Sequence, residues 1–133
     1  MNEHLAAAAE KSLRAAYDGT IDFPAIVGLL IEAGFESYWI DYRRGAAIYY
    51  LPSGESTVLE LPADEVAVAA EFDGNALEDA IREAQSASPG YSYAGFCRKV
   101  KAAGCAGYLV SFFGRRAVYF ARSGETHVEH FRD

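Results

Sequence analysis

The stretch "PSGEST" at residues 52–57 returns as "RSGETH" at residues 122–127, and the two copies occupy equivalent places in a longer repeat. Residues 23–61 align with residues 93–131 without a gap at a constant offset of 70, and nine of these 39 positions are identical. About two or three identities are expected by chance at ordinary composition. The alignment therefore predicts two halves of similar fold within one chain.

Each repeated unit opens with the pattern of a capped helix. Asp22 and Ser92 occupy the same place before an apolar periodic run, and both residue types are good N-caps. Both runs end at "AG", where Gly34 and Gly104 suit the left-handed conformation that closes a helix. The run at 25–34, "AIVGLLIEAG", is apolar on nearly every side and predicts a buried helix.

Two further helices are expected, one ahead of each unit. Residues 3–17 are rich in alanine and residues 75–87 read "NALEDAIREAQSA", and both stretches have helical apolar periodicity. Asp73 or Asn75 would cap the second helix. Between the units, the connector of residues 62–74 could hold an extra short strand over residues 65–72.

After each closing glycine the apolar period changes to two, which is typical of strands. The alternating residues are Tyr38, Ile40 and Tyr42 in the first half and Tyr108, Val110 and Phe112 in the second. A second strand follows a turn, and residues 52–54 and 122–124 then read as three-residue hairpin loops with Gly54 and Gly124 left-handed. The repeated "SGE" is thus interpreted as a turn that needs no catalytic role.

These patterns predict an α+β fold built from a duplicated ααβββ unit with pseudo-twofold symmetry. Residues 1–133 would form a single domain, with half-repeats at roughly 1–61 and 75–133. Short turns make the strands of each half antiparallel. Two assemblies remain open, namely one six-stranded antiparallel sheet or two facing three-stranded sheets, in either case packed by helices.

Composition restricts the class of protein. The net charge of −7 argues against nucleic-acid binding, although residues 91–133 carry 7 basic and 3 acidic residues and are locally positive. No apolar run reaches the length of about 18 residues that spans a bilayer, and no secretory signal is evident. We expect a cytoplasmic protein without cofactors, in which Cys97 and Cys105 are buried thiols that fill the core.

A binding face is predicted from the hairpin pairing. A loop at residues 52–54 pairs Tyr49 with Thr57 and Ile48 with Val58, and we expect Ile48, Tyr50 and Val58 to lie on the helix-covered face. The opposite face would then be unusually aromatic for a wet surface. Its candidate binding residues are Trp39, Asp41, Tyr49, Tyr119, His127 and Glu129. This face could join two copies in a homodimer, lie under the connector, or bind a small molecule or peptide.

Catalytic and metal-binding readings are weaker. A small hydrolase would use His127 as the base with Ser111 or Asp41, which the predicted pairing places on one face. His127 and His130 are three apart on a strand and point to opposite faces, so they cannot chelate one ion and no metal site is predicted.

The motifs "AGxxxYxxD", "SGES" and "SGETHVEHF" together resemble an uncharacterised bacterial family that is sometimes labelled "phage envelope protein" and includes YbcV-like prophage sequences. The resemblance covers essentially the whole chain and implies the same duplicated α+β domain, with no established reaction to carry over. The leading hypothesis is a non-catalytic small soluble binding or interaction module of bacterial or prophage origin. The alternatives are the hydrolase and a phage structural component.

Overall fold

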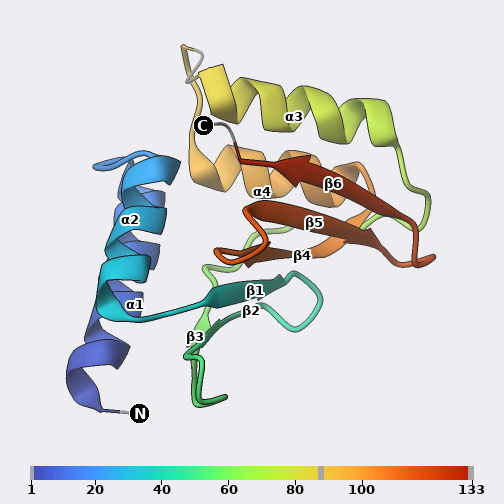
Figure 1. Ribbon diagram of the computed structural model, residues 1–133. Helices are drawn as coiled ribbons and strands as arrows, with labels where there is room; N and C mark the ends of the chain where they lie inside the picture. The colour runs from blue at the N-terminus through green and yellow to red at the C-terminus, as the bar shows by residue number, and fades with distance from the viewer. Residues whose placement is uncertain (1, 87–88, 132–133) are drawn as a thin grey trace.

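The computed structural model describes residues 2–86 and 89–131, and in these ranges the chain forms four helices and one six-stranded sheet (Figure 1). The first half contains α1 (Glu3–Asp18), α2 (Phe23–Ala33), β1 (Ser37–Asp41), β2 (Ala46–Tyr50) and β3 (Ser56–Glu60). The second half contains α3 (Gly74–Ser86), α4 (Tyr93–Ala102), β4 (Cys105–Ser111), β5 (Arg116–Ala121) and β6 (Thr126–His130). The predicted α+β class is confirmed.

The strands form a single antiparallel sheet in the order β3-β2-β1-β4-β5-β6. Of the two assemblies left open, the structure has the six-stranded sheet. Each half supplies three adjacent strands, and β1 joins β4 at the centre, where Trp39 lies opposite Leu109. Gly107 permits this junction, because a Cβ at that position would meet the Ile40 carbonyl oxygen at 2.3 Å.

The repeated "SGE" forms hairpin turns, as predicted. Gly54 and Gly124 have φ of 92° and 89°, in the left-handed region. In the first turn, Ser53 Oγ accepts from the Glu55 N–H at 3.2 Å and donates to the Glu55 carboxylate at 3.4 Å. Ser123 makes the same two contacts with Glu125. Serine and glutamate recur because together they close the loop, which explains the echo without catalysis.

The helix caps follow the residue types that predicted them. The Asp22 side chain accepts from the Ala25 N–H at 3.0 Å, and the Ser92 hydroxyl accepts from the Gly95 N–H at 3.0 Å. Of the two caps considered for α3, Asp73 is used, since its carboxylate accepts from the Ala76 N–H at 3.0 Å.

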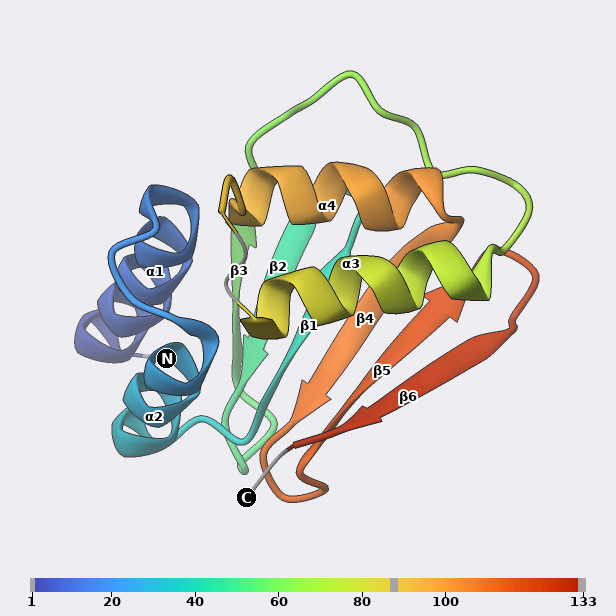
Figure 2. The ribbon, with the colours of Figure 1, turned by 90° about the horizontal axis from the view of Figure 1, so that it is seen from above.

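The connector forms no strand over residues 65–72, which settles a question that the sequence left open. Its backbone instead lies along the C-terminal end of α4, where the Ala69 N–H donates to the Lys101 carbonyl and the Asp73 N–H to the Ala103 carbonyl. These donors bind a helix end and therefore pair with no strand. Figure 2 shows the segment passing beyond α4, away from the strands.

One face of the sheet carries the core. Residues from all four helices, including Ala9, Leu30, Leu77 and Val100, pack in one cluster with the inward side chains of the central strands. Those inward residues are Tyr38, Ile40, Ala47, Tyr49, Tyr108, Val110, Ala117 and Tyr119. Figure 2 shows α3 and α4 lying over this face, with α1 and α2 beside β3.

The predicted division of residues between the two faces is right for β1 and β4 and wrong for β2, β3, β5 and β6. Tyr38 pairs with Tyr49 and Trp39 with Ile48, so even residues of β1 share a face with odd residues of β2. Residues paired across antiparallel strands point the same way. Ile48, Tyr50 and Val58 therefore lie opposite the helices, with Trp39. The turn between β1 and β2 decides this parity, and apolar residues on both faces hide it in the sequence.

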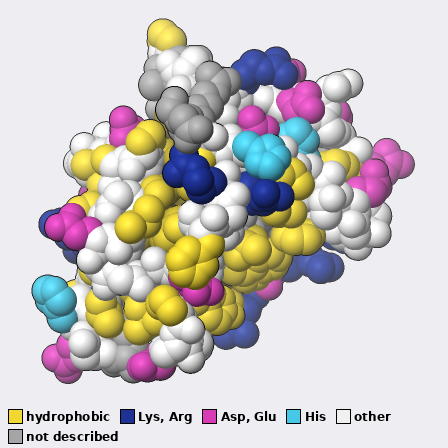
Figure 3. All heavy atoms as spheres, viewed as in Figure 1, with side chains coloured by type: hydrophobic (Ala, Val, Ile, Leu, Met, Phe, Trp, Pro, Cys, Tyr) yellow, Lys and Arg dark blue, Asp and Glu magenta, His cyan; other side chains and the backbone are white. Residues whose placement is uncertain are grey.

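The expectation of a buried second helix is also wrong. Val27 and Leu30 of α2 face the core, but Leu29 is 39% and Ile31 is 52% exposed. Hydrophobic side chains reach the surface over the part of the molecule that contains α1 and α2 (Figure 3). In the described part of the chain, none of the helices combines the length and apolar character needed to cross a membrane.

Candidate binding surface

An unbroken apolar row crosses the sheet on the side away from the helices. Partner by partner, the pairing places one residue of every strand in this row. We use the name apolar row for these six residues, which are Val58, Ile48, Trp39, Leu109, Val118 and Val128. None of the six belongs to the core cluster or packs against it, and Val58 and Val128 are 48% and 41% exposed.

Two flanking rows complete this surface, which we call the open sheet face. One flank consists of Ser56, Tyr50, Ser37, Ser111, Arg116 and His130, and the other of Glu60, Ala46, Asp41, Gly107, Phe120 and Thr126. The first flank is basic at its β5–β6 end. The second is acidic towards β3. An apolar centre with a polar, charged margin is the usual composition of a protein interface.

The Trp39 indole lies over β4 and β5 on the open sheet face. Its ring contacts Phe120 with centroids 5.3 Å apart, and a Cβ added at Gly107 would lie 3.4 Å from indole Cζ2. The glycine thus leaves room for the ring to lie across β4. Since Trp39 is the one tryptophan of the chain, it reports directly on this surface.

The structure divides the six predicted binding residues between the two faces. Trp39 and Asp41 lie on the open sheet face, whereas Tyr49 and Tyr119 are core residues, 3% and 7% exposed. Burial raises the pKa of both tyrosines well above the ordinary value. Sequence reasoning missed Ile48, Tyr50, Val58, Val118, Phe120 and Val128. Alternation within each strand could have grouped them once the pairing parity was known.

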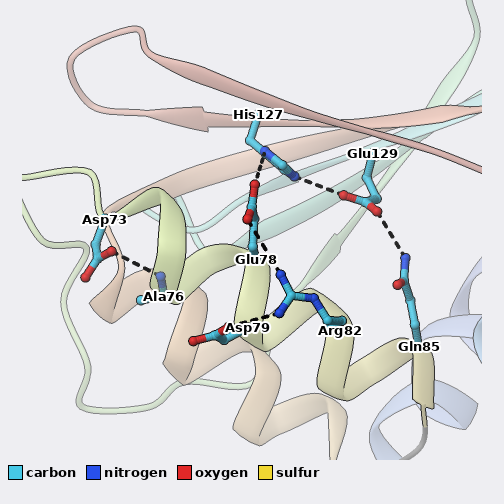
Figure 4. Close-up of polar contacts among 8 residues, drawn as sticks. All are labelled: Asp73, Ala76, Glu78, Asp79, Arg82, Gln85, His127 and Glu129. Carbon is cyan, nitrogen blue, oxygen red and sulfur yellow. Dashed lines mark hydrogen bonds and ion pairs between the residues drawn. The ribbon is translucent and has the colours of Figure 1, made fainter.

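His127 and Glu129, the remaining two predicted residues, join β6 to α3 (Figure 4). His127 Nε2 lies 2.9 Å from a Glu129 carboxylate oxygen, and its Nδ1 lies 3.8 Å from Glu78 of α3. The other Glu129 oxygen accepts from the Gln85 side-chain amide at 3.3 Å. These contacts attach the edge strand to the helix above it, and we interpret the cluster as a structural latch.

The residues grouped for a hydrolase are not brought together. His127 lies on the helix-covered side, whereas Ser111 and Asp41 lie on the open side. The Ser111 hydroxyl accepts from the Gly114 N–H at 2.9 Å, and the Asp41 carboxylate accepts from the N–H groups of two residues in the turn that follows it. Both side chains therefore cap turns, and no nucleophile–base pair forms among them. His127 and His130 point to opposite faces, as predicted.

The cysteines are buried free thiols, as expected. Burial raises the pKa of Cys97 and raises that of Cys105 to about 11, so both are protonated at neutral pH. Within residues 2–86 and 89–131, no three His, Cys, Asp or Glu side chains gather as a metal site would require.

A polar hollow of about 670 Å³ lies where the β1–β2 turn meets the connector and α4. Lys101 Nζ contacts the Asp64 carboxylate at 2.6 Å and lies 5.8 Å from the centre of the Tyr42 ring. The ammonium group lowers the pKa of Asp64. The Lys101–Asp64 ion pair thus holds the connector against α4.

Comparison with known proteins adds no assignment. No protein-family model matches the chain. No curated protein matches it either. The function is therefore argued from the open sheet face and its neighbours.

Proposed function

We propose that the protein is a non-catalytic binding module that acts as a homodimer, in which the open sheet faces of two copies pack together. The observation that carries the proposal is the apolar row, which crosses all six strands and has no cover among the described residues. The connector, once considered as a cover, lies at α4 instead. An antiparallel sheet tolerates one wet face, but that face is ordinarily polar.

The size of the face suits a second copy. Five paired residues from each of the six strands, at about 4.8 Å between strands and about 3.4 Å per residue, give on the order of 500 Å² per copy. Two copies would bury on the order of 1,000 Å², which is about the lower limit for a specific protein interface. Face-to-face sheet packing also lets the apolar rows interdigitate, as in a β-sandwich.

Charge also favours a second copy of the same chain. Arg116 and His130 are neighbours on adjacent strands at the β5–β6 end of one flank. Glu60 lies at the β3 end of the other flank, and Asp41 lies nearer its centre. These groups occupy diagonally opposite corners of the face. A copy turned over about a twofold axis in the interface can place each basic corner on its partner's acidic corner, which makes the surface self-complementary.

The proposed duplication of an ααβββ unit is supported by the pairing of the strands. Tyr38 pairs with Tyr49 in the first half, and Tyr108 pairs with Tyr119 in the second, which is the same register displaced by 70. At the central junction, the Tyr42 N–H donates to the Ala106 carbonyl and the Phe112 N–H to the Glu36 carbonyl. Each residue of the first bond corresponds to a residue of the second at an offset of 70, Tyr42 to Phe112 and Glu36 to Ala106. A pseudo-twofold axis between the halves requires such a matched pair of bonds.

Mass in solution tests the dimer. We expect light scattering to give twice the mass of the 14.5 kDa chain, and Val118→Glu to give a monomer with an unchanged circular dichroism spectrum. An unpaired charge at the centre of an apolar interface is strongly unfavourable. Phe113→Glu is the matched control, since Phe113 is 78% exposed and lies outside the apolar row, and it should remain dimeric.

Trp39 provides a second readout of the same equilibrium. Dilution of the wild type should shift its fluorescence to longer wavelength as the indole becomes wet, whereas Val118→Glu should show the wet spectrum at every concentration. A wild type that is monomeric at high concentration would refute the dimer. Large assemblies would instead favour the phage structural component.

A further inference from the structure

The C-terminal ends of α2 and α4 hold equivalent places 70 residues apart, but among residues 2–86 and 89–131 only the end of α4 is covered. There the connector lies directly on the helix: the Ala69 N–H donates to the Lys101 carbonyl at 3.0 Å, and the Asp73 N–H donates to the Ala103 carbonyl at 2.8 Å. Contact is so close at Gly104 that an added Cβ would lie 2.1 Å from the Glu71 carbonyl oxygen. Lys101 is consequently only 8% exposed.

The same end of α2 is bare. Ile31, at the position of Lys101, is 52% exposed, and a Cβ added at Gly34 would meet nothing within 4 Å. The Ile31 carbonyl accepts from the Gly34 N–H at 2.9 Å, just as the Lys101 carbonyl accepts from the Gly104 N–H at 3.0 Å. The Lys101 carbonyl receives a second N–H from the connector, and no other described residue supplies one to Ile31.

From this difference we infer that the C-terminal end of α2 binds an extended peptide segment of a partner protein, in the way that residues 64–73 bind α4. The segment would donate two backbone N–H groups, spaced like those of Ala69 and Asp73, to the carbonyls of Ile31 and Ala33. Its chain would pass close to Gly34, where the absence of a side chain leaves room for a backbone. Main-chain bonds of this kind accept many sequences, and one or two side chains supply the selectivity.

The residue at position 31 indicates the chemistry of that segment. On α4, Lys101 pairs with Asp64 of the connector at 2.6 Å. On α2 the equivalent residue is Ile31, so an acidic residue at the matching place would lose its hydration without gaining a partner. An apolar residue would bury against the Ile31 side chain, which is 52% exposed. The site therefore selects an extended segment with an apolar residue where the connector has Asp64.

Peptides copied from the connector test the inference. The probes are a ten-residue peptide with the sequence of residues 64–73 and the same peptide carrying Asp64→Leu. We expect the D64L peptide to shift the amide NMR signals of Ile31, Ala33 and Gly34, and the unmodified peptide to bind several-fold more weakly. The protein is used as the Val118→Glu variant, so that the result does not depend on the sheet-face dimer.

Ile31→Lys reverses the selectivity and serves as the specificity test. This variant copies the α4 site at an exposed position, so its fold should be retained. Compared with the protein that keeps Ile31, the variant should bind the unmodified peptide about threefold to fivefold more tightly, which is the gain expected of one partly exposed ion pair. It should bind the D64L peptide less tightly. A matched Phe113→Lys variant, which adds the same single positive charge at another exposed apolar position, should leave both affinities unchanged.

Three results would overturn the inference. One is the absence of signal changes at residues 31–34 with either peptide at millimolar concentration. Another is a set of changes confined to the open sheet face, or to Lys101 and Gly104, where a peptide would be displacing the connector. The third is loss of the wild-type dimer in Ile31→Lys, which would make this helix end a contact between copies.

Discussion

The two faces of the sheet are both apolar, yet they differ in what covers them. The inner face presents Tyr38, Tyr49, Tyr108 and Tyr119 to four helices, and each of these side chains is at least nine-tenths buried. On the open sheet face none of the described helices covers the apolar row, whose end residues Val58 and Val128 are exposed and whose four central residues are half-buried. The pattern of apolar residues in a strand therefore does not show which face of the sheet the chain's own helices cover. In the proposed dimer, a second copy would cover the open sheet face.

The tyrosines of the inner face give the largest expected effect. Burial raises the pKa of Tyr38 and Tyr108 well above the ordinary value of 10.0, while an unfolded tyrosine ionises near pH 10. The folded chain thus holds more protons than the unfolded chain above that pH. The stability associated with these groups is complete below about pH 10 and is lost as pH rises further.

We therefore expect cooperative alkaline unfolding above about pH 10, with phenolate absorbance at 295 nm rising together with the loss of circular dichroism. Addition of salt to screen surface charge serves as the control and should move the midpoint only slightly. Full ionisation of the buried tyrosines with the fold intact would contradict the burial described for the inner face.

Truncation of one side chain on each face sharpens the comparison further. Ile40 is 1% exposed on the inner face, so Ile40→Ala should lower the free energy of unfolding by about 2–5 kcal/mol. Val58 is 48% exposed on the open face, so Val58→Ala should cost less than about 1 kcal/mol in the monomer. Urea denaturation in the Val118→Glu background measures both. Equal losses would mean that the two faces are covered alike.

The smallest effect is expected at the edge strand, where two histidines of β6 point to opposite faces. His127→Ala removes the contacts to Glu78 and Glu129 and should lower the free energy of unfolding by about 1 kcal/mol. His130→Ala removes the same residue type from the same strand, but on the open side. This variant should change the free energy of unfolding by less than about 0.5 kcal/mol. The ratio of the two losses, measured in urea at one pH, tests whether the latch is structural.

Local residue chemistry predicted much of the fold correctly. The turns at Gly54 and Gly124, the caps at Asp22 and Ser92, and the order of helices and strands were all expected from short stretches of sequence. Each depends on the conformational preference or hydrogen bonding of residues within about four positions. The same reasoning placed the thiols of Cys97 and Cys105 in the core.

The candidate site was predicted only in part, since Trp39 and Asp41 were placed correctly and Tyr49 and Tyr119 were not. The difference arises at the turn between β1 and β2, where one residue more or less would reverse every side chain of the strand. Either the odd or the even residues of β2 could face the helices, and both sets contain apolar residues. The sequence pattern alone therefore did not indicate which set is buried. The position of the connector was missed for a similar reason, because its partners are the carbonyls at the end of α4.

The amino-acid order alone was enough to predict helices, strands and turns, because these follow from contacts between near neighbours in the chain. Long-range packing determined the single sheet, the face that the helices cover, and the contrast between the ends of α2 and α4. The physical reason is that such choices depend on pairings between residues as far apart as Trp39 and Leu109, where a shift of one position exchanges the buried and exposed sets.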